Sequence, residues 1–220
     1  MFKLKSIILL SGLMLLCGCF EVIEEVTYKD SESGTYLMTL NASQSKTKLQ
    51  ALMNMDSFMG TKIPQRHDIY RYCSLASLAA GKIKGVSAAN YTVDFDKFIF
   101  TFTFNFDNTE TLNQAINAAA QATASKDNLP YYNVFAFHNQ TFQRHQTPND
   151  SIAQLAKDKQ DQLKLISGAK ATSIYRFAKP VSKISNTHAK ISKNKKAVML
   201  QQQITDILTN PALFTNTITF

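Results

Sequence analysis

The chain lacks several features that would point to a well-known chemistry. Its 220 residues include 7 glycines, 3 cysteines and no tryptophan. It has neither a Gly-rich loop that could cradle a phosphate nor a Gly-x-Ser-x-Gly nucleophile elbow, and few glycines from which to build either. No apolar run reaches the roughly 18 to 20 residues that span a bilayer as a helix. These absences count against nucleotide-binding enzymes, elbow-type serine hydrolases and permanent transmembrane helices.

The N-terminus has the pattern of a secretion signal. Lys3 and Lys5 precede an apolar run at residues 7–16, which is the order of a charged n-region and an apolar h-region. An acidic segment at residues 21–25 follows at once, which favours cleavage over permanent insertion. The run ends in Leu16-Cys17-Gly18-Cys19, which resembles the bacterial lipobox. We expect residues 1–18 to be removed as a signal peptide.

The lipobox resemblance implies that Cys19 is the lipid-modified first residue of the mature chain. In that family a diacylglyceryl group is attached to the cysteine thiol, and the new amine is usually acylated with a fatty acid such as palmitate. Cys17 fits this role less well because Leu16 would stand where a small residue is expected. Two or three acyl chains make such an anchor effectively permanent, at about 0.8 kcal/mol per buried CH₂. The alternative is an ordinary secreted protein with a chance cysteine.

Processing leaves Cys73 without a cysteine partner, so no disulfide framework is expected. No His or acidic residue stands at a spacing that would activate this thiol. The surrounding apolar residues recur with helical periodicity, which predicts a core position on a helix; they are Ile69, Tyr72, Cys73, Leu75, Ala76, Leu78 and Ala79.

Periodicities along the chain predict an α+β fold. Phenylalanine occupies every second position from Phe98 to Phe106, which predicts a strand with one face on a core; an aromatic ligand platform is the alternative. Hairpins are expected at residues 21–40, 86–106 and 131–145. Helices are expected around residues 44–55 and 68–80, from residue 109 to about 127, and over 151–167. The result is a mainly antiparallel sheet built from β-hairpin–helix units, with helices packed on one face.

The C-terminal section, residues 169–220, consists mainly of short β-like runs with a brief helical turn near residues 206–208. No Gly/Pro/Ser-rich linker precedes it, so we expect residues 19–220 to form a single domain that this section completes.

Charge is unevenly spread. Residues 19–150 contain 11 Lys and Arg against 13 Asp and Glu, whereas residues 151–220 contain 11 against 3. The basic section could face phosphate-bearing lipids or acidic polysaccharide. Alternatively it is a solvated lysine-rich face, since Lys193, Lys195 and Lys196 resemble the tip of a hairpin.

Few residues suggest a metal site or a catalytic site. The four histidines, His67, His138, His145 and His188, are scattered. His138 and His145 could oppose each other across a hairpin and hold a metal. Met53, Met55 and Met59 offer soft thioether ligands, but methionine commonly fills gaps in a core. Asp94 and Asp96 suit a turn. We therefore assign no catalytic residue, no metal ligand and no cofactor.

The chain resembles a group of envelope lipoproteins without an established activity, found mainly in bacteria of the Bacteroidetes type. The resemblance is carried by residues 18–25, 33–35, 40–46, 55–57, 175–180 and 185–186, including Tyr175-Arg176-Phe177-Ala178-Lys179-Pro180. A more distant likeness is to LppM-like lipoproteins, which share a hairpin after the lipidated cysteine and have been linked to lipid binding. Phe20 is not the aspartate that retains enterobacterial lipoproteins in the inner membrane, which implies the outer membrane. Phe20-Glu21-Val22-Ile23 does not match the surface-export signal of some relatives, which implies an orientation toward the periplasm.

Three functions remain open. The first is a membrane-anchored, non-catalytic module that binds or assembles with an envelope protein. The second is a binder of lipid or another amphiphile, using the apolar interior and the basic section, with anionic lipid as a partner. The third is a hydrolase whose site is assembled from distant residues. No nucleic-acid partner is expected.

Overall fold

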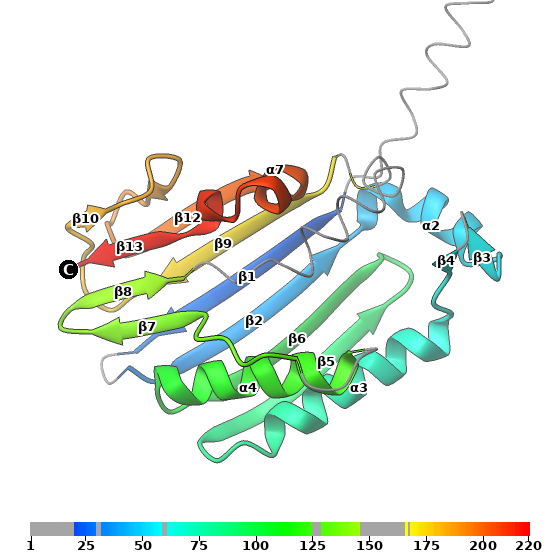
Figure 1. Cartoon of the computed structure of the whole chain (residues 1–220), viewed down its shortest axis with the longest axis horizontal. Helices are drawn as coiled ribbons and strands as arrows, with labels where there is room; N and C mark the ends of the chain where they lie inside the picture. The colour runs from blue at the N-terminus through cyan, green and yellow to red at the C-terminus, as the bar shows by residue number, and fades with distance from the viewer. Residues whose placement is uncertain (1–19, 30–31, 59–60, 125–128, 146–165, 167) are drawn as a thin grey trace, which may run out of the picture.

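The computed structural model of the protein describes residues 20–29, 32–58, 61–124, 129–145, 166 and 168–220. Seven strands form the main sheet in the order β11-β12-β9-β1-β2-β6-β5 (Figure 1). In chain order they are β1 (Glu21–Tyr28), β2 (Gly34–Asn41), β5 (Val86–Asp94), β6 (Ile99–Phe106), β9 (Lys170–Arg176), β11 (Lys190–Ile191) and β12 (Ala197–Gln203). Every pairing is antiparallel except that of β1 with β9, which is parallel.

A second layer covers one face of this sheet. Half of it is helical, with α3 (Arg66–Gly81) and α4 (Thr109–Thr123) packed over β5 and β6. The other half is a four-stranded sheet in the order β10-β13-β8-β7, from β7 (Phe135–His138), β8 (Thr141–Arg144), β10 (Lys183–Ile184) and β13 (Asn216–Thr219). Figure 1 shows α4, β7, β8 and β13 side by side in front of the main sheet.

Short elements stand at the rims. They are the 3₁₀ helix η2 (Ser43–Ser45), α2 (Lys46–Leu52), the small hairpin of β3 (Ser57–Phe58) and β4 (Thr61–Lys62), α7 (Ile204–Thr209) and the 3₁₀ helix η3 (Pro211–Phe214). None of the helices in the described part of the chain has the length and apolar character needed to span a bilayer.

Two asparagines of α4 join the two halves of the second layer. The Asn113 side chain donates to the Phe135 carbonyl at 2.8 Å and accepts from the Phe135 N–H at 3.0 Å. Asn117 makes the same pair of bonds with Tyr132, at 2.9 Å each. These amides satisfy backbone groups that a neighbouring strand would otherwise pair, so the helix takes the place of a strand at the β7 edge.

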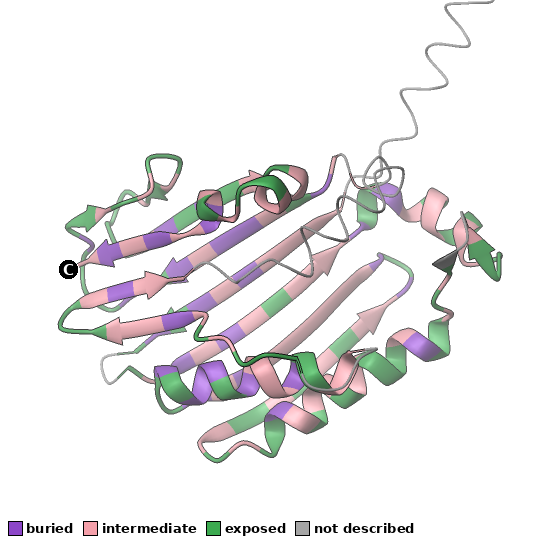
Figure 2. Ribbon diagram, viewed as in Figure 1, coloured by how far each residue is buried: buried purple, intermediate pink, exposed green. Residues whose placement is uncertain are grey.

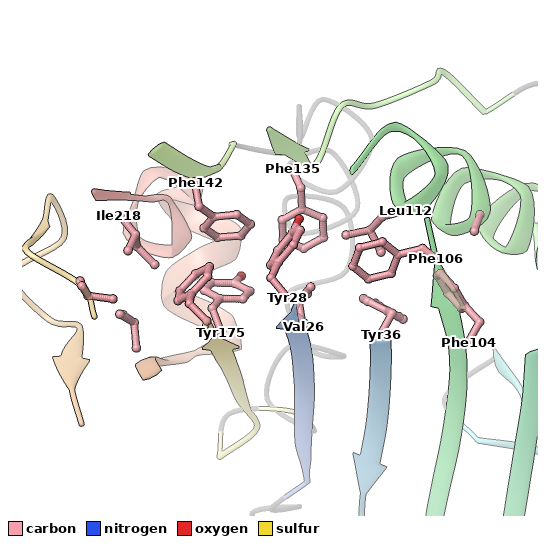
Figure 3. Close-up of a cluster of buried hydrophobic side chains, with 14 of the residues drawn as sticks. Val26, Tyr28, Tyr36, Phe104, Phe106, Leu112, Phe135, Phe142, Tyr175 and Ile218 are labelled. Carbon is pink, nitrogen blue, oxygen red and sulfur yellow. The ribbon is translucent and has the colours of Figure 1, made fainter. Parts of the chain in front are cut away.

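An aromatic core fills the space between the layers (Figure 3). Tyr28 and Tyr175 rise from β1 and β9 to meet Phe142 of β8, with ring centroids 5.5 and 4.8 Å from the Phe142 ring. Phe104 and Phe106 of β6 are 1% and 2% exposed, and Leu112 of α4 is fully buried. Each such ring removes a large apolar area from water, so this cluster supplies most of the drive for the layers to associate.

A buried ion pair crosses the same interface. The Arg144 Nε atom of β8 lies 3.2 Å from Glu24 Oε1 of β1, and both side chains are 11% exposed. The Tyr175 hydroxyl donates to the same carboxylate at 2.7 Å, and burial raises the Tyr175 pKa well above its usual value. Arg144 also donates to the Phe214 carbonyl and stacks over the Phe214 ring at 4.4 Å. Burial alone would lower the pKa of Arg144, but Glu24, together with Tyr175 and Tyr36, outweighs it and raises that pKa.

The structure confirms the α+β class, the mainly antiparallel sheet and the helices on one face. The hairpins are found at the expected positions, but the third one, β7–β8, joins the second sheet and not the main one. The helix expected at residues 151–167 lies outside the described residues. The apolar face expected on α3 is wrong in part: Tyr72, Leu75 and Leu78 are 39%, 38% and 61% exposed, although α3 contacts α4, β5 and β6 (Figure 2).

We expect Glu24→Gln to lower the free energy of unfolding by about 3 to 5 kcal/mol, because it leaves Arg144 as a buried charge without its counter-charge. Urea denaturation of the secreted Cys19→Ala form measures this. Glu25→Gln is the matched control on the same strand, since it breaks the more exposed pair with Arg176 and is expected to cost at most about 1 kcal/mol. If the two variants lose the same free energy of unfolding, Glu24 does not hold the two layers together as a buried charge.

Candidate binding pocket

One end of the main sheet is defined by the pairing register. Glu21 opens β1 and is paired with Asn41 of β2 and Lys170 of β9, and Asn41 is paired with Ile99 of β6. Phe20 immediately precedes this row, so the chain enters the fold here. Figure 1 shows α2 and the β3–β4 hairpin standing at this same end. We call it the anchor end, because Cys19 is the residue before Phe20.

An apolar chamber of about 300 Å³ lies at the anchor end. Phe20 and the α2 residues Leu49 and Leu52 line it. No residue of α2 is fully buried, but Leu49 packs with Phe20 against a small buried cluster of Ala42, Phe95 and Phe98. The lining is apolar throughout and consists of Phe20, Leu40, Ala42, Leu49, Leu52, Met53, Ile63, Pro64, Ile69, Phe98 and Phe100. The volume falls at the lower end of the range for small-molecule pockets.

The β5–β6 turn supplies the floor of this apolar chamber. Phe95 and Phe98 are 6% and 1% exposed, and the Phe95 ring lies 5.4 Å from Phe100 and 6.0 Å from Phe98 in edge-on contacts. Phe98 adopts a left-handed backbone conformation with φ of 54°, which turns its ring inward, and its carbonyl accepts the Ala42 N–H at 2.9 Å. The turn is fixed by Asp94, whose carboxylate accepts the Lys97 N–H at 2.8 Å.

A second hollow, of about 540 Å³, adjoins the first and is mainly polar, and we call it the polar chamber. It is open to solvent, since Gln50, Asn54, Arg66 and His67 are exposed. The two share Met53 and Phe98, and the remaining lining of the polar chamber is Gln50, Asn54, Gln65, Arg66 and His67. The Arg66 guanidinium stacks on the Phe95 ring at 4.8 Å, which holds the cation beside the apolar floor. An apolar chamber thus opens beside a polar one that contains a permanent positive charge.

Local hydrogen bonds position the polar residues at the start of α3. The Asp68 carboxylate accepts the Gln65 N–H at 3.1 Å in a capping box, and this bond lowers the Asp68 pKa, as do His67 and Arg71 nearby. His67 Nε2 lies 3.4 Å from Asp68 Oδ1. No Ser, Thr or Cys lines the polar chamber, so among the described residues this His–Asp pair has no nucleophile to activate.

The residues singled out in the sequence lie in different places. Cys19 lies outside the described residues. Cys73 is half-buried in α3, and burial raises the pKa of its thiol, which disfavours the reactive thiolate. His138 is paired with Thr141, whereas the N–H of His145 bonds Val134 at the other end of the hairpin, so the two histidines are not opposite each other. No group of three metal-ligating side chains occurs among the described residues.

Most of the basic C-terminal section described by the structure lies away from the apolar chamber. Arg176 ends β9 opposite Thr27, and Lys196 precedes the start of β12, so both lie at the far end of the sheet from Phe20. Lys170 lies at the same end as the chamber: its N–H donates to the Phe20 carbonyl at 2.9 Å, and it lines a small pocket together with Phe20. The use of both features by one ligand stays a prediction. Arg66 and His67, which sequence reasoning did not single out as ligand contacts, line the polar chamber, and Arg66 carries a permanent positive charge.

Comparisons with known proteins add little to this geometry. No family model matches the chain, and no curated protein matches it. Among solved structures the chain is similar to the NMR structure of the folded domain of LppM from Mycobacterium tuberculosis, with a TM-score of 0.44 and 9% identity, covering 91% of this chain and 88% of that chain. No ligand or activity follows from a similarity at this level.

Proposed function

We propose that the protein is a lipid-anchored, non-catalytic binding protein of a bacterial envelope, and that it binds a single-chain amphiphile with an anionic head. The observation that carries the proposal is the pair of adjoining chambers at the anchor end. The apolar chamber suits the tail, and the polar chamber suits the head. Removal from water of each CH₂ group of a tail contributes about 0.8 kcal/mol, so about ten fully buried CH₂ groups match the roughly 8 kcal/mol of micromolar affinity before the cost of association.

The head is proposed to lie against Arg66 and His67. Arg66 is permanently charged, and its planar guanidinium can donate two parallel hydrogen bonds to a phosphate or a carboxylate. The ring of Phe95 beneath it limits the positions that this side chain can adopt. A neutral head of the same size would leave the guanidinium without a counter-charge, and an anionic head is therefore preferred.

The proposed anchor places this pocket next to a source of amphiphiles. Phe20 lines the apolar chamber and follows the proposed lipidated residue, Cys19, directly. With no spacer between the two, the chamber would open close to the headgroups of the membrane that holds the anchor. We propose the periplasmic face of the outer membrane as that location, on the strength of Phe20 after the cysteine.

A second candidate function is assembly with an envelope protein. It is supported by the exposed apolar stripe of α3, formed by Tyr72, Leu75 and Leu78 at a spacing of three residues. A protein helix or strand edge could cover such a stripe. The amphiphile proposal is preferred because it accounts for two chambers and a cation together, whereas the stripe is a single surface feature.

The anchor is tested by mass spectrometry and detergent partitioning of full-length protein expressed in a bacterial host. Wild-type protein is expected to begin at Cys19, to carry the mass of two or three acyl chains and to enter the detergent phase. Cys19→Ala is expected to stay in the aqueous phase. Cys17→Ala is the matched control and should be lipidated like the wild type; loss of lipid in that variant, and not in Cys19→Ala, would move the anchor to Cys17.

The pocket is tested with the secreted Cys19→Ala form, which removes the protein's own acyl chains from the experiment. Isothermal titration with lysophospholipids of increasing tail length should show affinity rising about fourfold per methylene until the chamber is full. Leu49→Trp should abolish this length dependence by filling the chamber. Leu78→Trp, at a 61% exposed position, is the matched control.

The head site is tested in the same titrations. Arg66→Gln is expected to weaken binding of the lysophospholipids about tenfold or more, because the phosphate loses a charge-assisted partner. An uncharged monoacylglycerol of the same tail length should bind the wild type and Arg66→Gln alike. Equal affinities of Leu49→Trp and the wild type for every tail would exclude the apolar chamber as the site.

A further inference from the structure

We propose that the end of the molecule opposite Phe20 binds an acidic polysaccharide. The surface in question is a cluster of six exposed lysines, which we call the lysine tip: Lys179, Lys183, Lys190, Lys193, Lys195 and Lys196. The orientation of this tip relative to the membrane rests on the anchor proposed above, whereas its binding to a polyanion does not.

The lysine tip is built from two chain segments that hydrogen-bond each other. The Val181 N–H donates to the Lys195 carbonyl at 2.7 Å, and the Phe177 N–H donates to the Lys196 carbonyl at 2.9 Å. The Ser182 N–H is bonded to Thr219 in turn, which ties the tip to β13. The lysine backbones are therefore held in place, although their side chains are exposed.

Few acidic side chains lie near the lysine tip to neutralise its positive charge. No Asp or Glu occurs between residues 162 and 205 of the sequence. Of the acidic residues that approach from other elements, Glu25 is paired with Arg176, and Glu32 borders a small pocket that also contains Lys29 and Lys179. Within the described residues, none of the six lysines makes an ion pair with a carboxylate. Six like charges at one end of a protein produce a strong local potential.

With β1 standing along the membrane normal, the membrane that holds the proposed anchor is too distant to be the partner of these charges. Strand β1 has 8 residues and runs from the anchor end toward the tip, a length of about 26 Å at 3.3 Å per residue. The Debye length at physiological ionic strength is about 8 Å, so headgroup charges at the anchor end are screened at the tip. In that orientation the tip meets its counter-charge away from the membrane.

The composition of the tip favours a polymer over a small ligand or a second bilayer. Lysine is a flexible point charge and lacks the planar fork with which arginine recognises a single phosphate. Ile191, at 38% exposed, is the one large apolar side chain that stands out between Lys179 and Lys196, so little can insert into lipid. A chain with repeated carboxylate or sulfate groups matches six separated charges without a shaped pocket.

The test uses the secreted Cys19→Ala form of the full chain with polygalacturonate as the probe, measured by microscale thermophoresis over a range of salt. The wild-type tip is expected to bind at low salt and to lose affinity steeply as salt rises. The triple variant Lys193→Gln, Lys195→Asn, Lys196→Gln should bind at least tenfold more weakly. Asparagine is chosen at position 195 because the backbone there has φ of 58°, which asparagine tolerates.

Two control variants show whether a loss of binding comes from the lysine tip itself, from the lower net charge of the protein or from misfolding. Lys62→Gln, Lys82→Gln, Lys84→Gln removes the same charge from exposed lysines elsewhere and should bind as the wild type does. Replacement of the three tip lysines by arginine should retain binding. The proposal is overturned if the variants at positions 193, 195 and 196 and at positions 62, 82 and 84 lose the same affinity for polygalacturonate. It is also overturned if the wild type binds anionic phospholipid vesicles but not polygalacturonate. Neither result bears on the anchor, which the Cys19 and Cys17 variants test separately.

Discussion

The two layers of the protein are held in register by the carboxylate of Glu24. It stands on the core face of β1, the strand around which the main sheet is arranged, and it is engaged by Arg144 from the second layer and by Tyr175 from the neighbouring strand. Aromatic packing supplies more free energy, but rings can slide past one another, whereas a buried charge allows one arrangement. The position of β8, and through it of β7, β13 and β10, depends on this pair.

This constraint also explains why the covering layer can be half helix and half sheet. The second sheet is fixed to β1 through Glu24 and Arg144, and α4 is fixed to the second sheet through Asn113 and Asn117. The β7 edge would otherwise expose unpaired backbone groups toward the helix. Two asparagine amides replace a missing strand, so the layer is continuous although its two halves have different secondary structure.

Much of the fold could be predicted from periodicity, because the signals are local. The alternating phenylalanines from Phe98 to Phe106 indicate β6, and the residues around Asn108 indicate the start of α4, where the Asn108 side chain accepts the Thr111 N–H at 2.9 Å. The separation of the strands into two sheets was not predictable, because β7 and β8 have the same pattern as a strand pair of the main sheet. The ion pair between Glu24 and Arg144 joins residues 120 positions apart, and nothing in one sequence links them. The chambers could not be predicted for the same reason: Leu49, Ile69 and Phe100 have the pattern of core residues and do pack against a buried cluster, and only their arrangement in space leaves an open pocket beside it.

The parallel pairing of β1 with β9 affects how the chain reaches its native state. Glu21 and Lys170 are neighbours in the sheet and about 150 positions apart in the chain, so the central pairing has a high contact order and a large loop-closure cost. The antiparallel group β1-β2-β6-β5 can form as soon as residue 106 has emerged, but one edge of β1 then stays open until β9 arrives. Until then that open edge is a template for pairing with other chains. A protein of this topology therefore stays open to mispairing until the strand that closes β1, more than 140 residues after it in the chain, has been delivered.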